Sequence, residues 1–248
     1  MVFLSDLDRT LIFSYKRDIG ESICVEEKDG KKLSFMTVNS AELFMEMTRR
    51  ATFIPITTRS AEQYGRIRFP NGYVPRYAVI DNGANLLVDG APDPIWREQF
   101  YGYFRKAQPE IEEARCFLEK ESRVYFEIRT VDEAFMFTKC HNSDEVMKLM
   151  EEEIQPRHTD FFTNGDKLYV IPKGTSKENA LERLRERFGD TITAAGDSLF
   201  DEGMLRASDH AIIKIGELCQ MKLNASQTAE TSGDDPDFTL CELLKLLD

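Results

Sequence analysis

The chain has 248 residues, of which 42% are hydrophobic and 10% aromatic, so it is long enough for one large or two modest domains with a real core. Its 44 acidic and 32 basic residues give a net charge of -12, which would repel a phosphate backbone and argues against nucleic acid as a partner. The five cysteines form no CxxC pair, and the first apolar run is too short for a signal peptide or a membrane span. We therefore expect a cytoplasmic protein with no membrane partner.

The first part of the chain predicts the start of a parallel α/β sheet. Residues 2–5 form a short apolar strand that stops at two aspartates. Residues 23–37 contain two strand-like pieces around Asp29 and Gly30, and we expect them to form a small flap over the strand end. A helix over 41–50, capped by Asn39 and Ser40, precedes a second buried strand at 51–60. This order of strand, flap, helix and strand is typical of a parallel sheet.

The middle of the chain has a different character. The pattern predicts a helix over 94–120, two adjacent strands at 123–130 and 134–140, and a helix over 143–154 capped by Ser143. Residues 160–172 contain Asn164 and Gly165 between two strand-like flanks. Helices and hairpin strands grouped in this way indicate a separate α+β domain, which we place at 86–169.

The end of the chain returns to alternating strands and helices. We expect a helix over 176–189 that closes on Gly189, a strand over 191–197, a short helix over 201–207 and a strand over 210–216. The polar stretch at 226–237 is predicted to be a loop. The sheet domain is therefore predicted to be discontinuous and to consist of residues 1–85 and 170–248.

Four acidic residues follow the ends of predicted strands: Asp6, Asp8, Asp197 and Asp201. They should converge, because ligands of a parallel sheet bind beyond the carboxyl ends of its strands. Carboxylates packed closely either take up protons or are neutralised by a cation, and oxygen ligands suit a hard ion such as Mg²⁺. We expect Asp6, the backbone carbonyl of Asp8, and Asp197 to hold this metal, with Asp201 completing or orienting its shell.

The same edge of the sheet offers hydroxyl and positive groups. A magnesium ion, the hydroxyl of Thr57 and the ammonium of Lys177 around a free carboxylate would stabilise the oxygens of a phosphoryl group. We therefore expect Asp6 to attack phosphorus as a nucleophile and to form an aspartyl-phosphate. Asp8 is the expected general acid and base.

Two of these residues have a second interpretation. Lys173 competes with Lys177 for the phosphate role, and we prefer Lys177 because it stands at the start of a predicted helix. Asp201 could be the N-cap of the helix over 201–207 instead of a metal ligand, and the two roles are compatible.

Four segments resemble the motifs of the haloacid dehalogenase superfamily. They are DLDRT at 6–10, the strand that ends in Thr57, Lys177 before a helix, and GDSLFDEGML at 196–205. The inserted domain resembles the type-II cap of the Cof-like and sucrose-phosphatase-like branch, subfamily IIB. The resemblance implies a Rossmann-like parallel-sheet core with an inserted α+β cap. It also implies a magnesium-dependent phosphatase for a small phosphorylated metabolite such as a sugar phosphate.

The resemblance extends to residues beside these motifs. TTRS at 57–60 matches the usual Thr-Gly-Arg of the branch with Thr58 in the middle place, and DNGAN at 81–85 resembles its Asn-Gly-Ala segment. Thr58, Arg59 and Asn82 are therefore candidate substrate-binding residues. Arg59 could instead be a solvated surface residue, and Asn82 could be only a turn residue.

Two positions depart from the superfamily pattern. Arg9 stands where glycine is usual and puts a cationic side chain near the active-site loop. Phe200 stands where asparagine is usual, which removes one polar contact. Two other functions use the same residues. A phosphomutase would return the phosphoryl group to a sugar, and a phospholigand-binding module would bind without turnover, with Phe200 as its only support.

Overall fold

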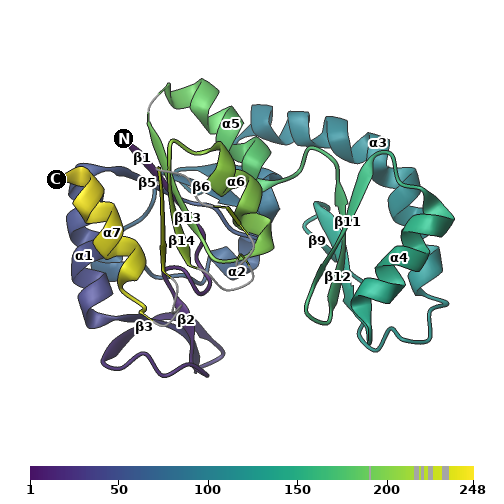
Figure 1. Cartoon of the computed structure of the whole chain (residues 1–248), viewed down its shortest axis with the longest axis horizontal. Helices are drawn as coiled ribbons and strands as arrows, with labels where there is room; N and C mark the ends of the chain where they lie inside the picture. The colour runs from purple at the N-terminus through teal and green to yellow at the C-terminus, as the bar shows by residue number, and fades with distance from the viewer. Residues whose placement is uncertain (190, 215–217, 219–220, 223–225, 231–234) are drawn as a thin grey trace. The chain divides into compact units, whose positions relative to one another are not determined.

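The computed structural model describes residues 1–189, 191–214, 218, 221–222, 226–230 and 235–248. The chain divides into two compact units, one of Met1–Pro92 with Lys177–Asp248 and one of Asp93–Ser176 (Figure 1). The second unit and the insertion predicted at 86–169 share residues 93–169. The unit begins later than predicted because two short antiparallel strands after residue 84 pair within the first unit, and it ends later, at Ser176. No helix of the described residues is both long and apolar enough to cross a membrane.

A five-stranded sheet, parallel throughout, forms the centre of the first unit. Its strands lie in the order β15 (Gln227–Glu230), β14 (His210–Lys214), β13 (Ile192–Gly196), β1 (Val2–Ser5) and β5 (Thr52–Pro55). The interior strand β1 is buried at every position, as a strand covered on both faces must be. Ser5 is aligned with Ala195 of β13 and with Pro55 of β5. The three chain segments that follow these strands therefore leave the sheet side by side.

Helices cover both faces of this sheet. Figure 1 shows α1 (Val38–Arg50) and α7 (Phe238–Leu247) on one face and α5 (Lys177–Phe188) and α6 (Glu202–Ala207) on the other. Between the sheet and α1, Phe44 packs edge to face on Phe53 with 5.1 Å between ring centroids. The layers confirm the predicted α/β fold with a Rossmann-like parallel-sheet core.

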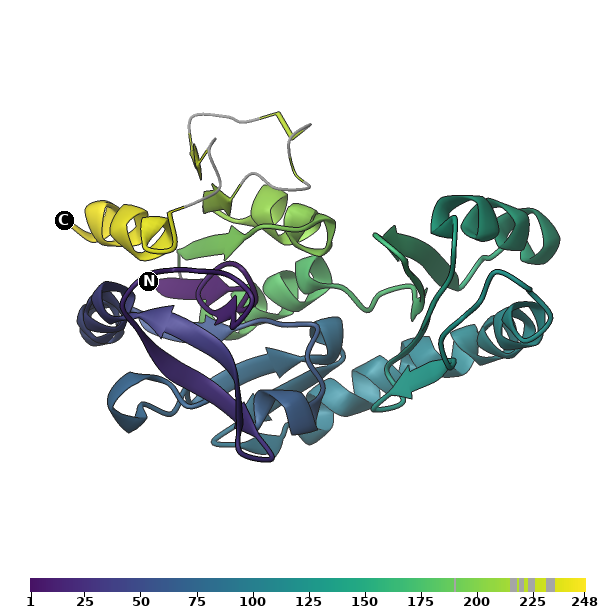
Figure 2. The same ribbon diagram turned by 90° about the horizontal axis from the view of Figure 1, so that it is seen from below.

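A small antiparallel sheet lies at the carboxyl ends of these strands. It contains β2 (Phe13–Ser14), β3 (Ser22–Lys28) and β4 (Lys31–Thr37), and the long strands β3 and β4 form a hairpin, the flap hairpin (Figure 2). Asp29 and Gly30 join the strands with φ values of 51° and 73°, the left-handed pair that a tight hairpin turn requires. This confirms the hairpin predicted over 23–37.

The described residues of the first unit also form shorter elements. They are α2 (Ala61–Tyr64), three 3₁₀ turns, η1 (Pro70–Gly72), η2 (Asp81–Gly83) and η3 (Leu199–Asp201), and a sheet of β6 (Tyr77–Ile80), β7 (Asn85–Val88) and β8 (Ala91–Pro92). An isolated parallel bridge between Ile56 and Val79 places β6 beside the end of β5.

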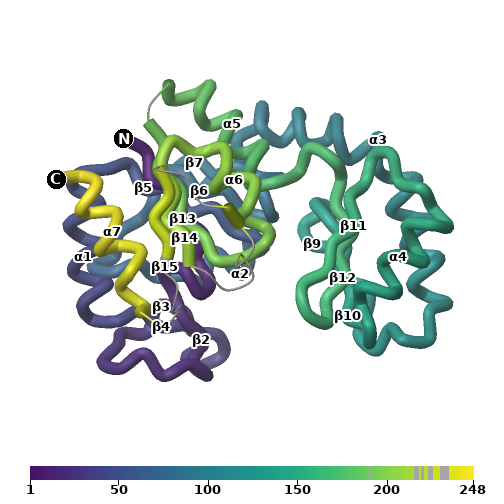
Figure 3. Tube along the Cα trace, in the orientation of Figure 1, coloured from purple at the N-terminus to yellow at the C-terminus, as the bar shows by residue number. Residues whose placement is uncertain are grey.

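The second unit is an α+β structure with its own core. Its four-stranded antiparallel sheet has the order β11 (Thr159–Asn164), β12 (Lys167–Pro172), β10 (Phe135–Lys139) and β9 (Arg129–Val131) (Figure 3). The helices α3 (Pro94–Leu118) and α4 (Ser143–Ile154) pack against it, and Ile111, Val146, Met136 and Val170 meet in one apolar cluster. This unit has the α+β architecture predicted for the insertion.

Two predicted helix caps were wrong. The cap of α1 is Thr37, whose hydroxyl accepts a hydrogen bond from the amide of Ser40 at 2.8 Å, so Asn39 and Ser40 lie inside the helix. Ser143 is likewise the first residue of α4, and its hydroxyl donates to the carbonyl of Gly165 at 2.7 Å. In both cases a polar residue next to the helix start was predicted to be the cap, but it lies inside the helix and the residue before the helix takes the N-cap position.

Two strand predictions also need correction. Most of 123–130 is irregular, and only its end belongs to β9, which pairs with β10. Before β9, the segment has one isolated antiparallel bridge, between Val124 and Cys140 just after β10. Residues 227–230, inside the predicted loop at 226–237, instead form the edge strand β15. The polar sequence of this segment does not predict a strand, and the strand is defined by its backbone pairing with β14.

Glu110 of α3 holds the chain segment that enters β11. Its carboxylate accepts hydrogen bonds from the amides of Arg157, His158 and Thr159 at 2.9 to 3.2 Å and from the hydroxyl of Thr159 at 2.8 Å. Burial raises the pKa of Glu110, but the bonds from Thr159, His158 and Arg157 outweigh it and lower the pKa below its ordinary value. The charged form is therefore the one that the fold stabilises.

We expect Glu110→Ala to reduce the free energy of unfolding by about 1–3 kcal/mol, because three amides lose a charged acceptor. Urea denaturation followed by circular dichroism measures this loss. A pKa lowered by folding stabilises above the unfolded value of 4.5, so the difference between wild type and variant should shrink as the pH falls below it. Glu112→Ala, an exposed change on the same helix, should cost no more than about 0.5 kcal/mol. Equal losses in the two variants would contradict the role of Glu110.

Candidate active site

Three predicted site residues follow the aligned ends of β1, β5 and β13. Asp6 comes directly after β1, Thr57 two residues after β5, and Asp197 directly after β13. The amide of Asp6 donates to the carbonyl of Ala195 at 3.0 Å, which continues the pairing of the two strands to this point. The register of the parallel sheet therefore brings these segments to one edge.

The carboxylates of Asp6, Asp197 and Asp201 gather at this edge. Each is buried, and one oxygen of each lies within 4.8 Å of the others. Oxygen donors at this spacing fit a hard divalent cation such as Mg²⁺. The side chain of Asp8 is outside this group, and its predicted metal contact through the backbone carbonyl stays a prediction.

Lys177, the first residue of α5, lies among these acids. Its Nζ is 2.6 Å from Oδ1 of Asp6 and 2.5 Å from Oδ1 of Asp201, and its side chain is only 1% exposed. Lys173 belongs to the second unit, where its half-exposed ammonium is 3.9 Å from Asp160. Of the two candidate lysines, Lys177 is the one that joins the acids.

The buried charges perturb one another. Burial raises the pKa of the Asp6 carboxyl well above its ordinary value, and the charge of Lys177 opposes this shift. The carboxylates of Asp201, Asp197 and Asp8 add to the rise in that pKa. Although burial lowers the pKa of Lys177, the charges of Asp201 and Asp6 bring it above its ordinary value. The three buried carboxylates outnumber the two cations beside them, Lys177 and Arg9, and a bound cation would offset this excess of negative charge.

Asp201 is held by the turn that precedes it. Its Oδ2 accepts hydrogen bonds from the amide of Asp197 at 3.2 Å and from the amide and hydroxyl of Ser198 at 3.0 and 2.8 Å. Asp201 does stand at the N-cap position of α6, the second interpretation given for it, but its side chain makes no cap bond to that helix and instead closes the turn before it. Gly196 allows this approach, because a Cβ there would lie 2.4 Å from Cβ of Asp201.

The loop after Asp6 returns to the acids. Arg9 has a left-handed backbone with φ of 64°, a conformation that favours glycine, and its Nε lies 2.7 Å from Oδ2 of Asp197. The hydroxyl of Thr10 donates to Oδ1 of Asp197 at 3.5 Å. Phe200 is half-buried in the η3 turn, where the hydroxyl of Ser198 supplies a polar contact to Asp201.

Thr57 is fully buried beside the η2 turn. Its hydroxyl accepts a hydrogen bond from the amide of Arg59 at 3.2 Å, and its carbonyl accepts one from the amide of Asn82 at 3.0 Å. Asn82 is 3% exposed and left-handed at φ of 56°, and Thr58 is half-buried next to Thr57. The backbone thus brings Asn82 to the Thr57 strand end, while substrate binding by Asn82 and Thr58 stays a prediction.

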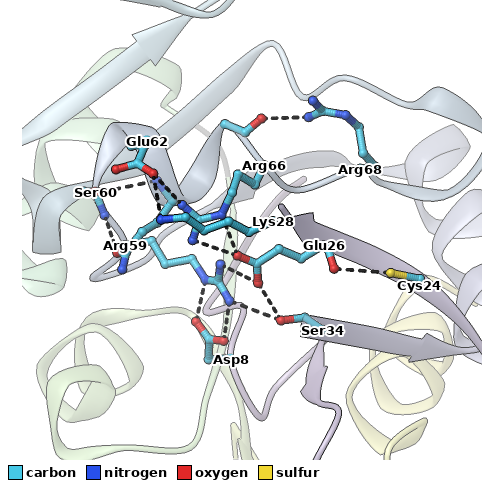
Figure 4. A network of polar contacts seen from close by, with 12 residues as sticks. Asp8, Cys24, Glu26, Lys28, Ser34, Arg59, Ser60, Glu62, Arg66 and Arg68 are labelled. Carbon is cyan, nitrogen blue, oxygen red and sulfur yellow. Dashed lines mark hydrogen bonds and ion pairs between the residues drawn. The ribbon is translucent and has the colours of Figure 1, made fainter. Parts of the chain in front are cut away.

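Arg59 and Asp8 form a second polar group at this edge. Arg59 donates to both carboxylate oxygens of Asp8 at 2.7 Å, and its Nη1 lies 3.0 Å from the buried Glu26 of β3 (Figure 4). Ser34 and Arg66 also bind Glu26. The sequence pattern did not single out Glu26, because a glutamate in a hairpin strand is usually exposed, and its partners Ser34 and Arg66 were therefore not predicted either. Arg59, which was predicted to contact substrate, forms ion pairs with the carboxylates of Asp8 and Glu26.

Comparisons with known proteins extend this picture. A family model described as sucrose-6F-phosphate phosphohydrolase matches residues 1–235. No curated protein matches the chain. Among solved structures, the chain is similar to the sucrose-phosphatase from Synechocystis sp. PCC6803 in complex with sucrose and phosphate. The TM-score is 0.67 at 14% identity, over 100% of this chain and 98% of that one.

Two further structures are similar along nearly their whole length. The Aspergillus fumigatus trehalose-6-phosphate phosphatase has a TM-score of 0.58 at 15% identity, over 98% of this chain and 92% of that one. A sugar phosphatase of haloacid dehalogenase subclass IIB has a TM-score of 0.63 at 14% identity, over 99% and 98%. At these identities the likeness shows a shared fold.

The position of Lys177 leads to a prediction about stability. Lys177→Met should lower the free energy of unfolding, measured in urea without divalent metal, by about 3–5 kcal/mol, because it leaves buried carboxylates without their cation. Lys173→Met removes a half-exposed ammonium 3.9 Å from its partner and should cost no more than about 1 kcal/mol. A Lys177→Met protein as stable as wild type would show that the ammonium does not hold these acids together.

Proposed function

The chain belongs to the sucrose-6F-phosphate phosphohydrolase family and is a phosphatase of the haloacid dehalogenase type, and on this premise we propose that it hydrolyses a small phosphorylated sugar. The family match confirms the predicted superfamily and its sucrose-phosphatase-like branch. The proposed reaction depends on magnesium and passes through an aspartyl-phosphate on Asp6. The observation that carries this proposal is the buried group of Asp6, Asp197 and Asp201 with Lys177 among them.

The donor set supports a magnesium ion as the cofactor. Asp6, Asp197 and Asp201 would hold it, together with the backbone carbonyl of Asp8, and all of these donors are oxygens. When bound, Mg²⁺ would offset the charge of the carboxylates and of the phosphoryl oxygens.

The chemistry proposed for the residues follows from their positions. Asp6 attacks phosphorus while the bond from phosphorus to the sugar oxygen breaks, and Asp8, which enters this step in its protonated form, gives its proton to that oxygen. Asp8 then takes a proton from water, which attacks the aspartyl-phosphate, releases inorganic phosphate and restores Asp6. Lys177 favours the ionised nucleophile from 2.6 Å, and the ammonium of Lys177 and the hydroxyl of Thr57 bind the transferring oxygens.

The substrate class rests on the family. The similar structures are named for sucrose and for trehalose 6-phosphate, so phosphorylated sugars are the first compounds to test. We assign the choice of sugar to the second unit, as the proposed cap, and keep Thr58 and Asn82 as candidate contacts. The cysteines at 24, 116, 140 and 241 are free thiols, which supports the cytoplasmic location that we propose, while Cys219 lies outside the described residues.

The decisive measurement is phosphate release with and without magnesium, over an aryl phosphate and a panel of sugar, nucleotide and cofactor phosphates. We expect magnesium-dependent turnover that falls by about 10³-fold or more in Asp6→Asn, because the amide cannot act as the nucleophile. Asp89→Asn, the same change at an exposed position, should keep wild-type rates. Phosphoryl transfer to a second sugar would indicate a phosphomutase, and binding without turnover a phospholigand-binding module. Either result would contradict the proposal.

Metal binding can be measured separately from activity. Millimolar MgCl₂ should raise the midpoint of thermal unfolding of the wild type by a few degrees, because a ligand of the folded state stabilises it by mass action. The shift should be much smaller in Asp197→Asn, which removes one charged oxygen donor. Sodium chloride at the same ionic strength controls for screening. An equal magnesium shift in both proteins would place the ion elsewhere.

A further inference from the structure

A β-bulge in the flap hairpin turns a carboxylate inward. Val25 and Glu26 are both buried although they are consecutive in β3, and successive side chains of a regular strand point to opposite faces. The pairing of β3 with β4 shifts register between Cys24 and Glu26 and again between Glu26 and Glu27. Bulges of this kind re-aim a side chain and are frequent next to active sites. Glu26 is 3% exposed as a result.

Both carboxylate oxygens of Glu26 are bound. Oε1 lies 2.9 Å from Nη2 of Arg66, and Oε2 lies 3.0 Å from Nη1 of Arg59 and accepts the hydroxyl of Ser34 at 2.6 Å (Figure 4). Burial raises the pKa of Glu26, but the bond from Ser34 and the charge of Arg59 outweigh it and lower that pKa. Glu26 is therefore a fixed anion inside the flap hairpin.

Arg59 extends this constraint to Asp8. The two bonds of 2.7 Å from Arg59 fix the plane of the Asp8 carboxylate, because the guanidinium fork is rigid. The side chain of Arg59 is 12% exposed and that of Asp8 is 52% exposed. Arg59 is thus bound by the buried Glu26 through Nη1 and by the half-exposed Asp8 through Nε and Nη2.

We propose that Glu26 is a positioning residue for phosphoryl transfer, acting through Arg59 to aim the Asp8 carboxylate at the oxygen that leaves. The inference deepens the proposed function and rests on it, because it takes Asp8 as the general acid. It also gives Arg59 a positioning role. The flap hairpin, which sequence analysis treated as a cover for the strand end, then contributes directly to the alignment of the acid.

Proton donation matters most when the leaving group is poor. An alkoxide needs its proton as the bond to phosphorus breaks, whereas a nitrophenolate departs without one. Misaimed Asp8 should therefore slow substrates in proportion to the basicity of their leaving oxygen. A general loss of structure would slow all of them alike. Three ring-bearing probes of similar shape separate the two cases: 4-nitrophenyl, phenyl and benzyl phosphate.

The test compares Glu26→Gln with wild type on these three compounds with magnesium. We expect kcat/KM, which reports the steps up to departure of the leaving group and not the later attack by water, to fall by about 10- to 100-fold on benzyl phosphate, less on phenyl phosphate, and by less than about threefold on 4-nitrophenyl phosphate. Glu62→Gln is the matched control, because Glu62 joins the same cluster at 3.0 Å from Arg66 but is 74% exposed. It should keep wild-type rates on all three.

A second variant keeps the proposal testable if Glu26→Gln does not fold. Glu26→Gln combined with Arg66→Gln removes one charge of each sign and leaves Arg59 bound by Asp8, and the same dependence on leaving group is expected. Equal losses on the three phosphates, or no loss on any, in a folded variant would overturn the role of Glu26 while leaving the phosphatase intact. Wild-type protein that hydrolyses none of them and no member of the sugar-phosphate panel would overturn the proposed function itself, and the inference with it.

Discussion

The buried ammonium of Lys177, bound between Asp6 and Asp201, is the interaction on which the site depends. Charges removed from water are stabilised only where their partners are close and well oriented, so the positions of all three are tightly constrained. They come from the end of β1, the start of α5 and the turn after β13. The parallel register of the sheet aligns the first and the last of these segments, and the small residue Gly196 lets Asp201 approach.

Two polar groups with different charge balance lie at this edge of the sheet. Around Lys177 and Arg9 the three carboxylates outnumber the cations, which suits a group that receives a metal ion and a phosphoryl group. Around Glu26 the signs alternate from Asp8 through Arg59, Glu26 and Arg66 to Glu62, so that each charge is compensated by its neighbours. The first group can therefore bind a charged ligand, and the second is suited to fix the orientation of the Asp8 side chain.

The sequence predicted the elements whose signal is local and periodic. Asp6, Thr57 and Asp197 could be placed together because each follows an apolar strand and parallel strands end at one edge. The position of Glu26 could not be predicted, because a bulge breaks the alternation of buried and exposed side chains along β3. The arginines that bind it are also distant in the chain. The caps Thr37 and Asn142 were missed for a related reason, because neighbouring polar residues compete for the same role and tertiary partners decide between them.

The order of the strands has a consequence for synthesis of the protein on the ribosome. The interior strand β1 needs β13 as its neighbour, and the bond between Lys177 and Asp6 spans 171 residues of chain. The second unit, by contrast, is one continuous stretch, Asp93–Ser176, and can fold as soon as it has emerged. During translation the nascent first part of the sheet therefore keeps one edge of β1 unpaired until the later strands arrive. Chaperone binding to that exposed edge would protect it during the interval.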